Sequence, residues 1–360
     1  MATEDSKEKV LKLLVDAARD QHRELFERAL RNVLSSGVAE LTYAQIADGL
    51  PLKSVVCNSR YGPFHVDHPM MTMHTELCSG VVERFRSIRS AFNITSLKFD
   101  STLIHAYQNA PTNSPAFHTR LIEMIAVAVH QIAAQIFKSE TGCHQDDGTT
   151  TWQCPPGSAY AEAHKSIPPT LFIFHYYCYY EQYPDGVADG VGYWAESQIL
   201  GGVVLFDRRE PGSPPNLSND LEVDPNAIYM HSDVYGRTYR IYQLTDSQRE
   251  QLIEFLLSKP TLPAAHAIPI RPGSKNIWRV DPEEAVVNTG VYRDIWERNP
   301  LEWDDEDPRD TRVFCEGEGA DWENGYELSR KRARYRYMRG IAESRERDPD
   351  ESLIRFPSRK

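Results

Sequence analysis

The chain lacks the sequence features that identify several large classes of protein. Its first residues, MATEDSKEKV, carry no cationic start followed by an apolar run, so no secretory signal is predicted. It has no run of about 18 uncharged apolar residues, because the longest candidate, residues 121–137, contains Glu123 and His130. These two absences predict a cytoplasmic protein with no membrane partner.

Motifs for phosphate binding and clustered metal ligands are also missing. The sequence has no GxxxxGK[ST], GxGxxG or GxSxG; Gly186, Gly190 and Gly192 lie close together but miss the dinucleotide spacing. Its six cysteines are scattered and form no CxxC pair. We therefore expect reduced thiols, no structural zinc cage and no cofactor.

The composition is that of a globular protein with an unusual C-terminal part. Of 360 residues, 41% are apolar and 10% aromatic, which is enough for a substantial core. The formal net charge of −12 disfavours general nucleic-acid binding. Residues 301–327 are strongly acidic, however, and residues 328–347 are rich in arginine. We predict one body over residues 1–300 and an acidic, then basic, extension over residues 301–360.

Hydrophobic periodicity predicts helices in the first part of the chain. Residues 5–35 and 74–92 have helical spacing of apolar side chains, whereas residues 94–107 look extended. Ser114-Pro115 is a helix-start signal, and the apolar run that follows it predicts a buried central helix.

Strand-like segments dominate the second part. LFIFHYYCYY, residues 187–194 and GGVVLFD are rich in β-forming residues, and residues 227–244 resemble two strands around Gly236. Thr245 and Gln248 form a capping box for a helix over residues 245–257. The predicted fold class is α+β, with a helix-rich part (1–140) packed on a mixed or antiparallel sheet with flanking helices (167–300).

The aromatic segment at residues 175–181 suggests a binding wall. Strand alternation would place four of its side chains on one face, and tyrosines with a carboxylate could hold a polar or cationic group. On this reading Glu181 and Tyr177 are catalytic, and the substrate-binding residues are Tyr179, His175, Trp194 and Glu196. The alternative is a tyrosine-rich sheet face buried under a helix.

Histidines near carboxylates offer two further hypotheses. His65-Val-Asp67 has the H-x-D spacing of non-haem iron oxygenases, and His231-Ser-Asp233 is a second such pair. Ordinary loop histidines are the interpretation we favour. Glu123 and His130 share one helix face and could form a buried acid–base pair. The interpretation we favour is a polar stripe that faces water and consists of Arg120, Glu123, Gln131, Gln135 and Lys138.

Two blocks of the sequence resemble intracellular proteins of filamentous fungi. They are YPDGVADGVGYWAESQILGGVVLFDRREP and IYMHSDVYGRTYRIYQLTDSQREQLIEFLL, within a resemblance that covers roughly residues 95–300. The chain also looks like the fungal arginine-containing cyclodipeptide synthases, which carry a DDxxE motif. The nearest segment here, Asp304-Asp305-Glu306-Asp307-Pro308, has proline in place of the glutamate.

This resemblance implies an enzyme of specialised metabolism that joins aminoacyl groups delivered by tRNA and releases a small cyclic product. The basic C-terminal segment would contact the tRNA. Two alternatives stay open: an oxygenase that binds iron through His65, Asp67 and a distal histidine, and a non-catalytic interaction protein that uses its charged C-terminal segments.

Overall fold

The computed structural model describes residues 12–14, 20–59, 67–139, 142–144, 148–149, 151–154, 169–213, 222–234, 238, 240–259, 267–273, 275–276, 279–280, 282 and 286–298. The chain divides into two compact units, Met1–Leu301 and Glu302–Lys360, and every described residue lies in the first. The acidic segment and the basic segment predicted to contact tRNA both lie outside the described residues.

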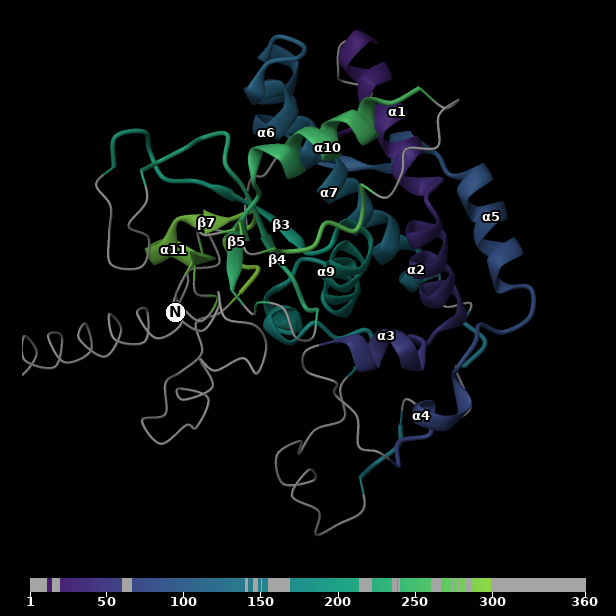
Figure 1. Cartoon of the computed structure of the whole chain (residues 1–360). Helices are drawn as coiled ribbons and strands as arrows, with labels where there is room; N and C mark the ends of the chain where they lie inside the picture. Colours follow the sequence, from purple (N-terminus) through teal and green to yellow (C-terminus); the bar gives the residue numbers. More distant parts are fainter. Residues whose placement is uncertain are drawn as a thin grey trace, which may run out of the picture. The chain divides into compact units, whose positions relative to one another are not determined.

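Helices and a small sheet make up the described part, which confirms the predicted α+β class (Figure 1). The α-helices are α1 (Asp20–Leu34), α2 (Gly37–Asp48), α3 (Lys53–Asn58), α4 (Met70–Met73), α5 (Val81–Ala91), α6 (Ser101–Asn109), α7 (Pro115–Lys138), α9 (Val187–Leu200), α10 (Asp246–Leu257) and α11 (Val286–Thr289). The 3₁₀ helices are η3 (Ile94–Ser96), η4 (His175–Tyr177) and η5 (Tyr180–Gln182).

The main sheet has five antiparallel strands in the order β6-β5-β4-β3-β7. Its strands are β3 (Val203–Asp207), β4 (Ile228–His231), β5 (Ile241–Gln243), β6 (Arg279–Val280) and β7 (Val291–Tyr292). A separate pair joins β1 (Lys12–Leu14) to β2 (Lys98–Asp100). The hairpin predicted around Gly236 is confirmed as β4 and β5.

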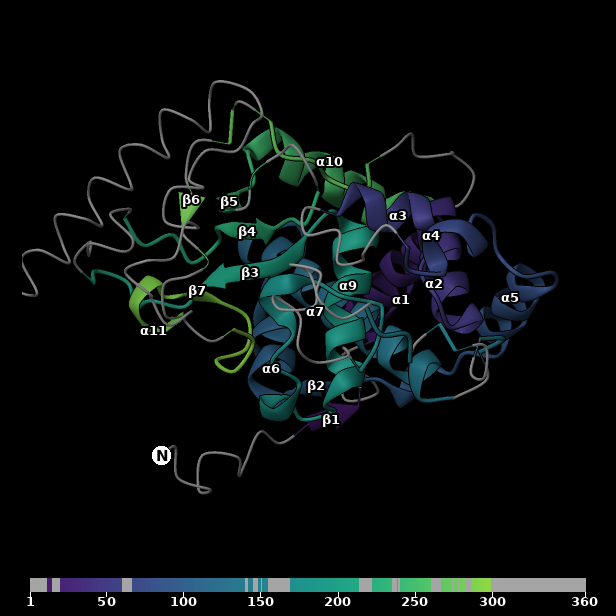
Figure 2. The same cartoon turned by 90° about the horizontal axis from the view of Figure 1, so that it is seen from below.

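Both faces of the main sheet are buried, and alternate side chains of β3 pack into different clusters. Val204 and Phe206 belong to the large core cluster shared with α1, α2, α7, α9 and α10. Val203 and Leu205 point the other way, into a second cluster that contains Tyr176, Tyr177 and Tyr183. The sheet is therefore the middle layer between the helices, seen beside it in Figure 2, and a tyrosine-rich cluster.

The central helix α7 forms as predicted. Ser114 accepts a hydrogen bond from the backbone N–H of Phe117, and Pro115 occupies the first turn. By length and hydropathy this helix alone, among the described residues, could cross a membrane, but 72% of its most apolar window is buried within the fold. Such burial is typical of a core helix, and it explains why the run is apolar almost all round.

Several local predictions are wrong. Of the segment 5–35, expected to be one helix, the described parts are the helix Asp20–Leu34 and the strand Lys12–Leu14. The extended segment expected over residues 94–107 is strand only at Lys98–Asp100 and continues as α6. The strand expected over residues 187–194 is part of helix α9. Gly190 and Gly192 lower the helix propensity of this segment, but they are needed because neighbouring side chains pack directly against them.

Candidate active site

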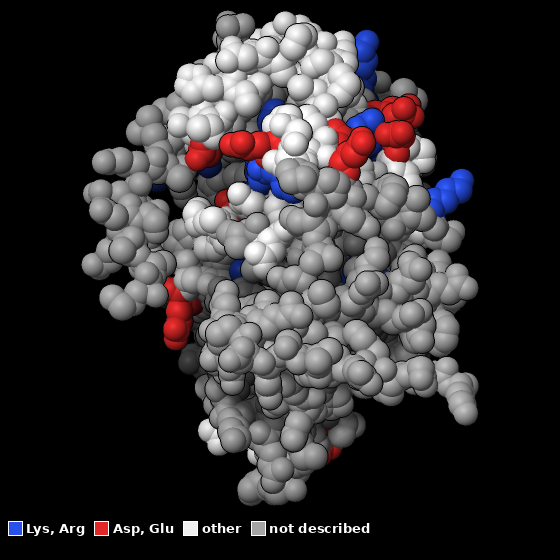
Figure 3. Space-filling view, turned by 90° about the vertical axis from the view of Figure 1, so that its left-hand side faces the viewer, with Lys and Arg blue, Asp and Glu red and all other residues white. Residues whose placement is uncertain are grey.

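A cleft of about 820 Å³ runs along one face of α7. Its walls come from α7, the β2–α6 region, the segment before α9, and residues 292–296. The polar stripe predicted on α7, including Arg120, Gln131 and Lys138, lines this cleft. Figure 3 shows one face of the molecule, on which described acidic and basic side chains lie beside one another. The described part of that face is thus of mixed sign.

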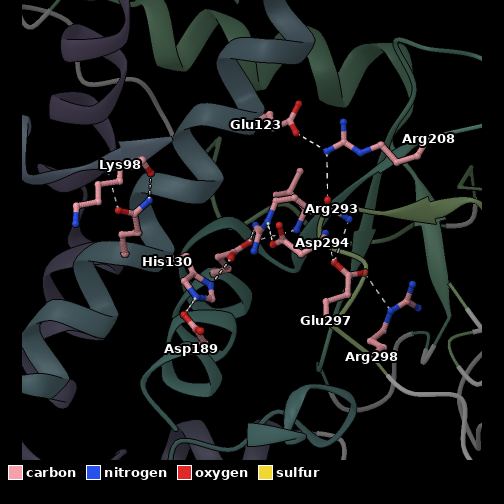
Figure 4. A network of polar contacts seen from close by, with 12 residues as sticks. Lys98, Glu123, His130, Asp189, Arg208, Arg293, Asp294, Glu297 and Arg298 are labelled. Atoms are coloured by element: carbon pink, nitrogen blue, oxygen red, sulfur yellow. Dashed lines mark hydrogen bonds and ion pairs between the residues drawn. The ribbon is translucent and has the colours of Figure 1, made fainter. Parts of the chain in front are cut away.

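His130 lies at the centre of a polar network beside the cleft (Figure 4). Its Nε2 is 2.9 Å from Asp189 Oδ1, and its Nδ1 is 3.0 Å from Glu196 Oε1. Both carboxylates come from α9, where a spacing of seven residues puts them on one helix face. The imidazole of α7 is therefore held between two turns of the neighbouring helix.

The carboxylates determine the charge of His130. Burial alone would lower the pKa of His130, but the hydrogen bonds and charges of Asp189 and Glu196 raise it to about 9. The ring is therefore an imidazolium at neutral pH, and both of its nitrogens donate. Asp189 and His130 both line the cleft, whereas Glu196 is fully buried behind them.

Arg293 compensates the buried charge of Glu196. Its Nη1 lies 2.7 Å from Glu196 Oε2, and its guanidinium carbon lies 5.5 Å from the centre of the Tyr193 ring. Burial alone would raise the pKa of Glu196, but the charges of Arg293 and His130 hold it below its usual value. Glu196 is thus an ionised carboxylate that bridges His130 and Arg293.

A glycine and a tyrosine on α9 allow this helix to pack closely against His130 of α7. A Cβ at Gly192 would lie 2.6 Å from atoms of the His130 ring, so only glycine leaves room for the imidazole. The adjacent Tyr193 contacts the same ring edge to face, with ring centroids 4.6 Å apart. The sequence Asp189-x-x-Gly192-Tyr193-x-x-Glu196 therefore forms a seat for His130.

Residues 293–298 form a wall that Glu297 organises. Glu297 is fully buried, and its Oε2 accepts the backbone N–H groups of Arg293 at 3.0 Å and Asp294 at 3.2 Å. Its Oε1 accepts Nε of Arg298 at 3.2 Å. This bonding fixes the short turn from which Arg293 reaches Glu196.

One end of the cleft carries excess positive charge. Glu123 is buried between Arg120 and Arg208 and forms ion pairs with both. Each arginine keeps about a quarter of its side chain exposed, and both line the cleft. Two guanidinium groups against one carboxylate leave a site suited to an anionic substrate group.

The pair of Glu123 and His130 that we considered does not form; each residue has other partners. The favoured interpretation, a stripe facing water, is wrong for Glu123, which is buried, as His130 is. It holds for Gln135 and Lys138, which are exposed.

The binding wall predicted over residues 175–181 rests on a strand that is absent. His175 and Tyr177 lie in η4 and Glu181 in η5, so strand alternation does not apply to them or to Tyr179. Tyr177 is fully buried and meets Nδ1 of His231 with its hydroxyl at 3.2 Å, whereas Glu181 is exposed. Their catalytic roles stay predictions without a shared surface to support them.

Trp194 and Glu196, expected on a neighbouring strand, lie on α9. Trp194 is buried against Phe172, with ring centroids 4.7 Å apart, and packs in the core. Of the six predicted site residues, Glu196 is the one that joins the polar network of the cleft.

Among the described residues, no group of potential metal ligands includes Asp67, so the iron hypothesis has no support there. His65 lies outside the described residues, and Asp67 is exposed. In the second H-x-D pair, His231 contacts Tyr177 and Asp233 binds Ser59. That pair joins structural elements and forms no common metal group among the described residues.

Sequence reasoning missed Asp189, Arg208, Arg293 and Asp294. A signal for Asp189 existed, because Asp189 and Glu196 are two acids at a spacing of seven in an otherwise apolar segment. It needed a helix assignment to become visible. Arg293 follows a two-residue strand and precedes a short turn, and no local pattern marks it. Comparison of the chain with family models, curated proteins and solved structures finds no match.

Proposed function

We propose that the cleft is the active site of an enzyme that moves a proton between two reacting groups of a small charged substrate. The observation that carries the proposal is the His130 imidazolium, held between Asp189 and Glu196 on the wall of the cleft. A histidine in a cleft with a strongly perturbed pKa and defined partners is typical of acid–base catalysis.

Each member of the network has a distinct role in this proposal. Asp189 accepts a proton from the attacking group, and His130 Nε2 gives one to the leaving group. The 2.9 Å hydrogen bond between them then returns the proton from Asp189 to His130. Glu196 and Arg293 are positioning residues: Glu196 lies behind the cleft, and Arg293, which lines it, is bound to Glu196.

The arginine end of the cleft would bind an anionic group of the substrate. Arg120 and His130 both face the cleft and are ten residues apart on α7, which corresponds to about 15 Å along the helix axis. A substrate that bridges both positions is extended. Its reacting centre lies away from its negative charge, as when a phosphate is carried on a long polar molecule.

Aminoacyl transfer remains the reaction class that the family resemblance suggests. In it an amine attacks an ester carbonyl, an amide bond forms and the ester C–O bond breaks. The amine loses a proton and the leaving hydroxyl gains one, so the step needs a base and an acid, with no redox partner. The Asp189–His130 pair could supply both, and Arg120 with Arg208 could bind a phosphate of an RNA end.

An untargeted mass-spectrometric comparison of yeast cells tests the proposal. Cells that express the wild-type chain should contain a product that is absent from cells expressing His130→Gln or Asp189→Asn. Glu254→Gln is the matched control, since Glu254 is exposed on α10 and outside the cleft. Circular dichroism of each purified variant checks that the fold is retained.

The same experiment separates the cleft from the earlier tyrosine-wall hypothesis. Product that persists at wild-type level in folded His130→Gln and Asp189→Asn proteins would contradict the proposal. Loss of product in Glu181→Gln, with full product in Asp189→Asn, would move the active site to the 175–181 segment. A product that contains arginine in a diketopiperazine ring would identify the reaction as cyclodipeptide synthesis.

A further inference from the structure

A second cluster of ionisable side chains lies outside the cleft, at the C-terminal end of α2. Three separate parts of the chain meet there: Asp48 ends α2, His74 and Cys78 precede α5, and Cys143 and His144 follow α7. Two overlapping groups share Asp48, one with Cys78 and Cys143 and one with His74 and His144. Within each group the potential ligand atoms all lie within 4.8 Å of one another.

Asp48 is a buried carboxylate with one incompletely satisfied oxygen. The residue is fully buried, and its Oδ2 accepts the backbone N–H of Cys78 at 3.0 Å. Its Oδ1 is buried without a hydrogen-bond partner, and His144 Nε2 lies 3.7 Å from it. An unsatisfied buried carboxylate oxygen is costly, so a cation that binds it would remove a large penalty.

The orientation of His74 also favours a cation. Its Nδ1 lies 2.9 Å from the carbonyl oxygen of Pro51, and since a carbonyl can only accept, Nδ1 carries a hydrogen. In the neutral ring Nε2 then carries a lone pair and no hydrogen, and it lies 3.1 Å from Asp48 Oδ2, which is also an acceptor. Two acceptors at this distance need a second proton or a metal ion between them. A histidine whose other nitrogen donates to a backbone carbonyl is the usual form of a metal ligand.

Two further distances in the cluster match those between neighbouring ligands of a tetrahedral ion. Bonds of roughly 2.0–2.3 Å to zinc place neighbouring ligand atoms about 3.3–3.8 Å apart. Cys78 Sγ is 3.3 Å from His144 Nε2, and His144 Nε2 is 3.7 Å from Asp48 Oδ1. Cations are also favoured at a helix C-terminus, which is where Asp48 lies.

Glycines bring the third segment close enough. Gly49 ends α2 in the left-handed conformation, with φ of 104°. A Cβ at Gly142 would lie 3.0 Å from the carbonyl oxygen of Asp48 and 3.1 Å from the Cα of Gly49. The backbone N–H of Cys143 donates to the same Asp48 carbonyl at 2.7 Å. This close approach positions Cys143 and His144 over the carboxylate.

We propose that this cluster binds one structural zinc ion through Asp48, His74, Cys78 and His144, with the Cys143 thiol beside it. Thiolate and imidazole ligands select zinc over magnesium or calcium, which prefer oxygen. Four protein ligands close the coordination sphere, so the ion ties α2, the segment before α5 and the segment after α7 together. Two of the scattered cysteines that argue against a zinc cage in the sequence, Cys78 and Cys143, are brought together by the fold.

Cobalt titration of the full-length protein, purified without a histidine tag and under reducing conditions, tests this site. The wild-type chain should bind one equivalent of Co²⁺, show a thiolate-to-cobalt charge-transfer band and release the cobalt to one equivalent of Zn²⁺. Asp48→Asn and His144→Ala should each weaken binding at least about 100-fold, since even outer ligands contribute about 10–100-fold. Cys57→Ser is the matched control, because Cys57 is an exposed free cysteine outside the cluster.

Two results would overturn the proposal. One is a wild-type chain that binds neither cobalt nor zinc stoichiometrically. The other is wild-type affinity in both ligand variants. Should Asp48→Asn fail to fold, His144→Ala decides the question, because the His144 side chain is partly exposed and its loss leaves no large buried hole.

Discussion

The cleft and the cluster at Asp48 each place a fully buried carboxylate beside histidine, yet they differ in how its charge is compensated. Glu196 has a partner on both oxygens, His130 on one and the buried Arg293 on the other. Asp48 meets His74 and His144, and the described residues provide no lysine or arginine ion pair for it. One site carries its own cation, and the other has ligands that would hold one.

This difference explains why we assign a proton to one site and a metal to the other. In the cleft the fixed arginine keeps Glu196 ionised, so His130 holds its proton, and a cleft gives a substrate access to it. Around Asp48 the ion pairs of the described residues involve histidines alone, and the soft ligand Cys78 favours a metal cation in the place that the arginine takes at Glu196. Two similar pairs of residue types therefore support different chemistry because of their third partners.

Replacing Arg293, which distinguishes the cleft from the Asp48 cluster, should cause the largest loss in the free energy of unfolding. Arg293→Leu would leave Glu196 buried with only His130 as a charged partner, and we expect a loss of about 3–5 kcal/mol in the free energy of unfolding. Urea denaturation at pH 7 measures it. Arg249→Leu is the control, because its ion pair with the exposed Asp246 should contribute less than about 1 kcal/mol. Equal losses in the two variants would show that Glu196 does not depend on Arg293.

Titration of His130 gives the next effect. Because folding raises the pKa of His130 from 6.5 to about 9, its contribution to stability is fully present below pH 6.5 and is lost as pH rises to 9. We expect the stability difference between the wild type and His130→Gln to fall by roughly 3 kcal/mol over this range. Urea denaturation at several pH values follows it. A constant difference would mean that the ring is neutral in the folded protein.

If His130 is the general acid, its titration should also appear in catalysis. The rate kcat/KM should decline as pH rises through about 9, because the imidazolium then loses the proton it donates. Asp189→Asn removes one of the two charges that raise the pKa, so any residual activity should decline at lower pH. A decline at unchanged pH would place the titrating group elsewhere.

The helical framework was accessible from the sequence, but the site was not. Ser114-Pro115 and the Thr245–Gln248 box depend on local hydrogen bonds, and both mark helix starts where predicted. Helix α9 was misread as a strand, since its glycines are present for contacts with Tyr180 and His130 from distant segments. Both the cleft and the Asp48 cluster join residues far apart in sequence, and local periodicity carries no information about such meetings.

Alanine substitutions at Gly192 and Gly142, the two glycines that allow close packing at the sites, should have smaller effects. In Gly192→Ala the new methyl group would meet the His130 ring, which its two carboxylates prevent from moving, so we expect a loss of about 1–3 kcal/mol. Gly37→Ala is the matched control at the start of α2, where nothing lies within 4 Å of an added Cβ. Thermal unfolding should separate the two variants. Similar behaviour would mean that α7 and α9 can move apart freely.

Gly142→Ala should have the smallest effect on stability and a selective effect on metal binding. Its Cβ would press on the Asp48 carbonyl and Gly49 at about 3 Å, a contact that a shift of a few tenths of an ångström relieves. That shift would carry Cys143 and His144 away from Asp48, and because zinc needs ligand distances within about 0.2 Å we expect roughly tenfold weaker cobalt binding. The free energy of unfolding without metal should change by less than about 1 kcal/mol. Unchanged cobalt affinity would show that the segment after α7 does not position a ligand, and Asp48, His74 and Cys78 would then be the residues that hold the ion.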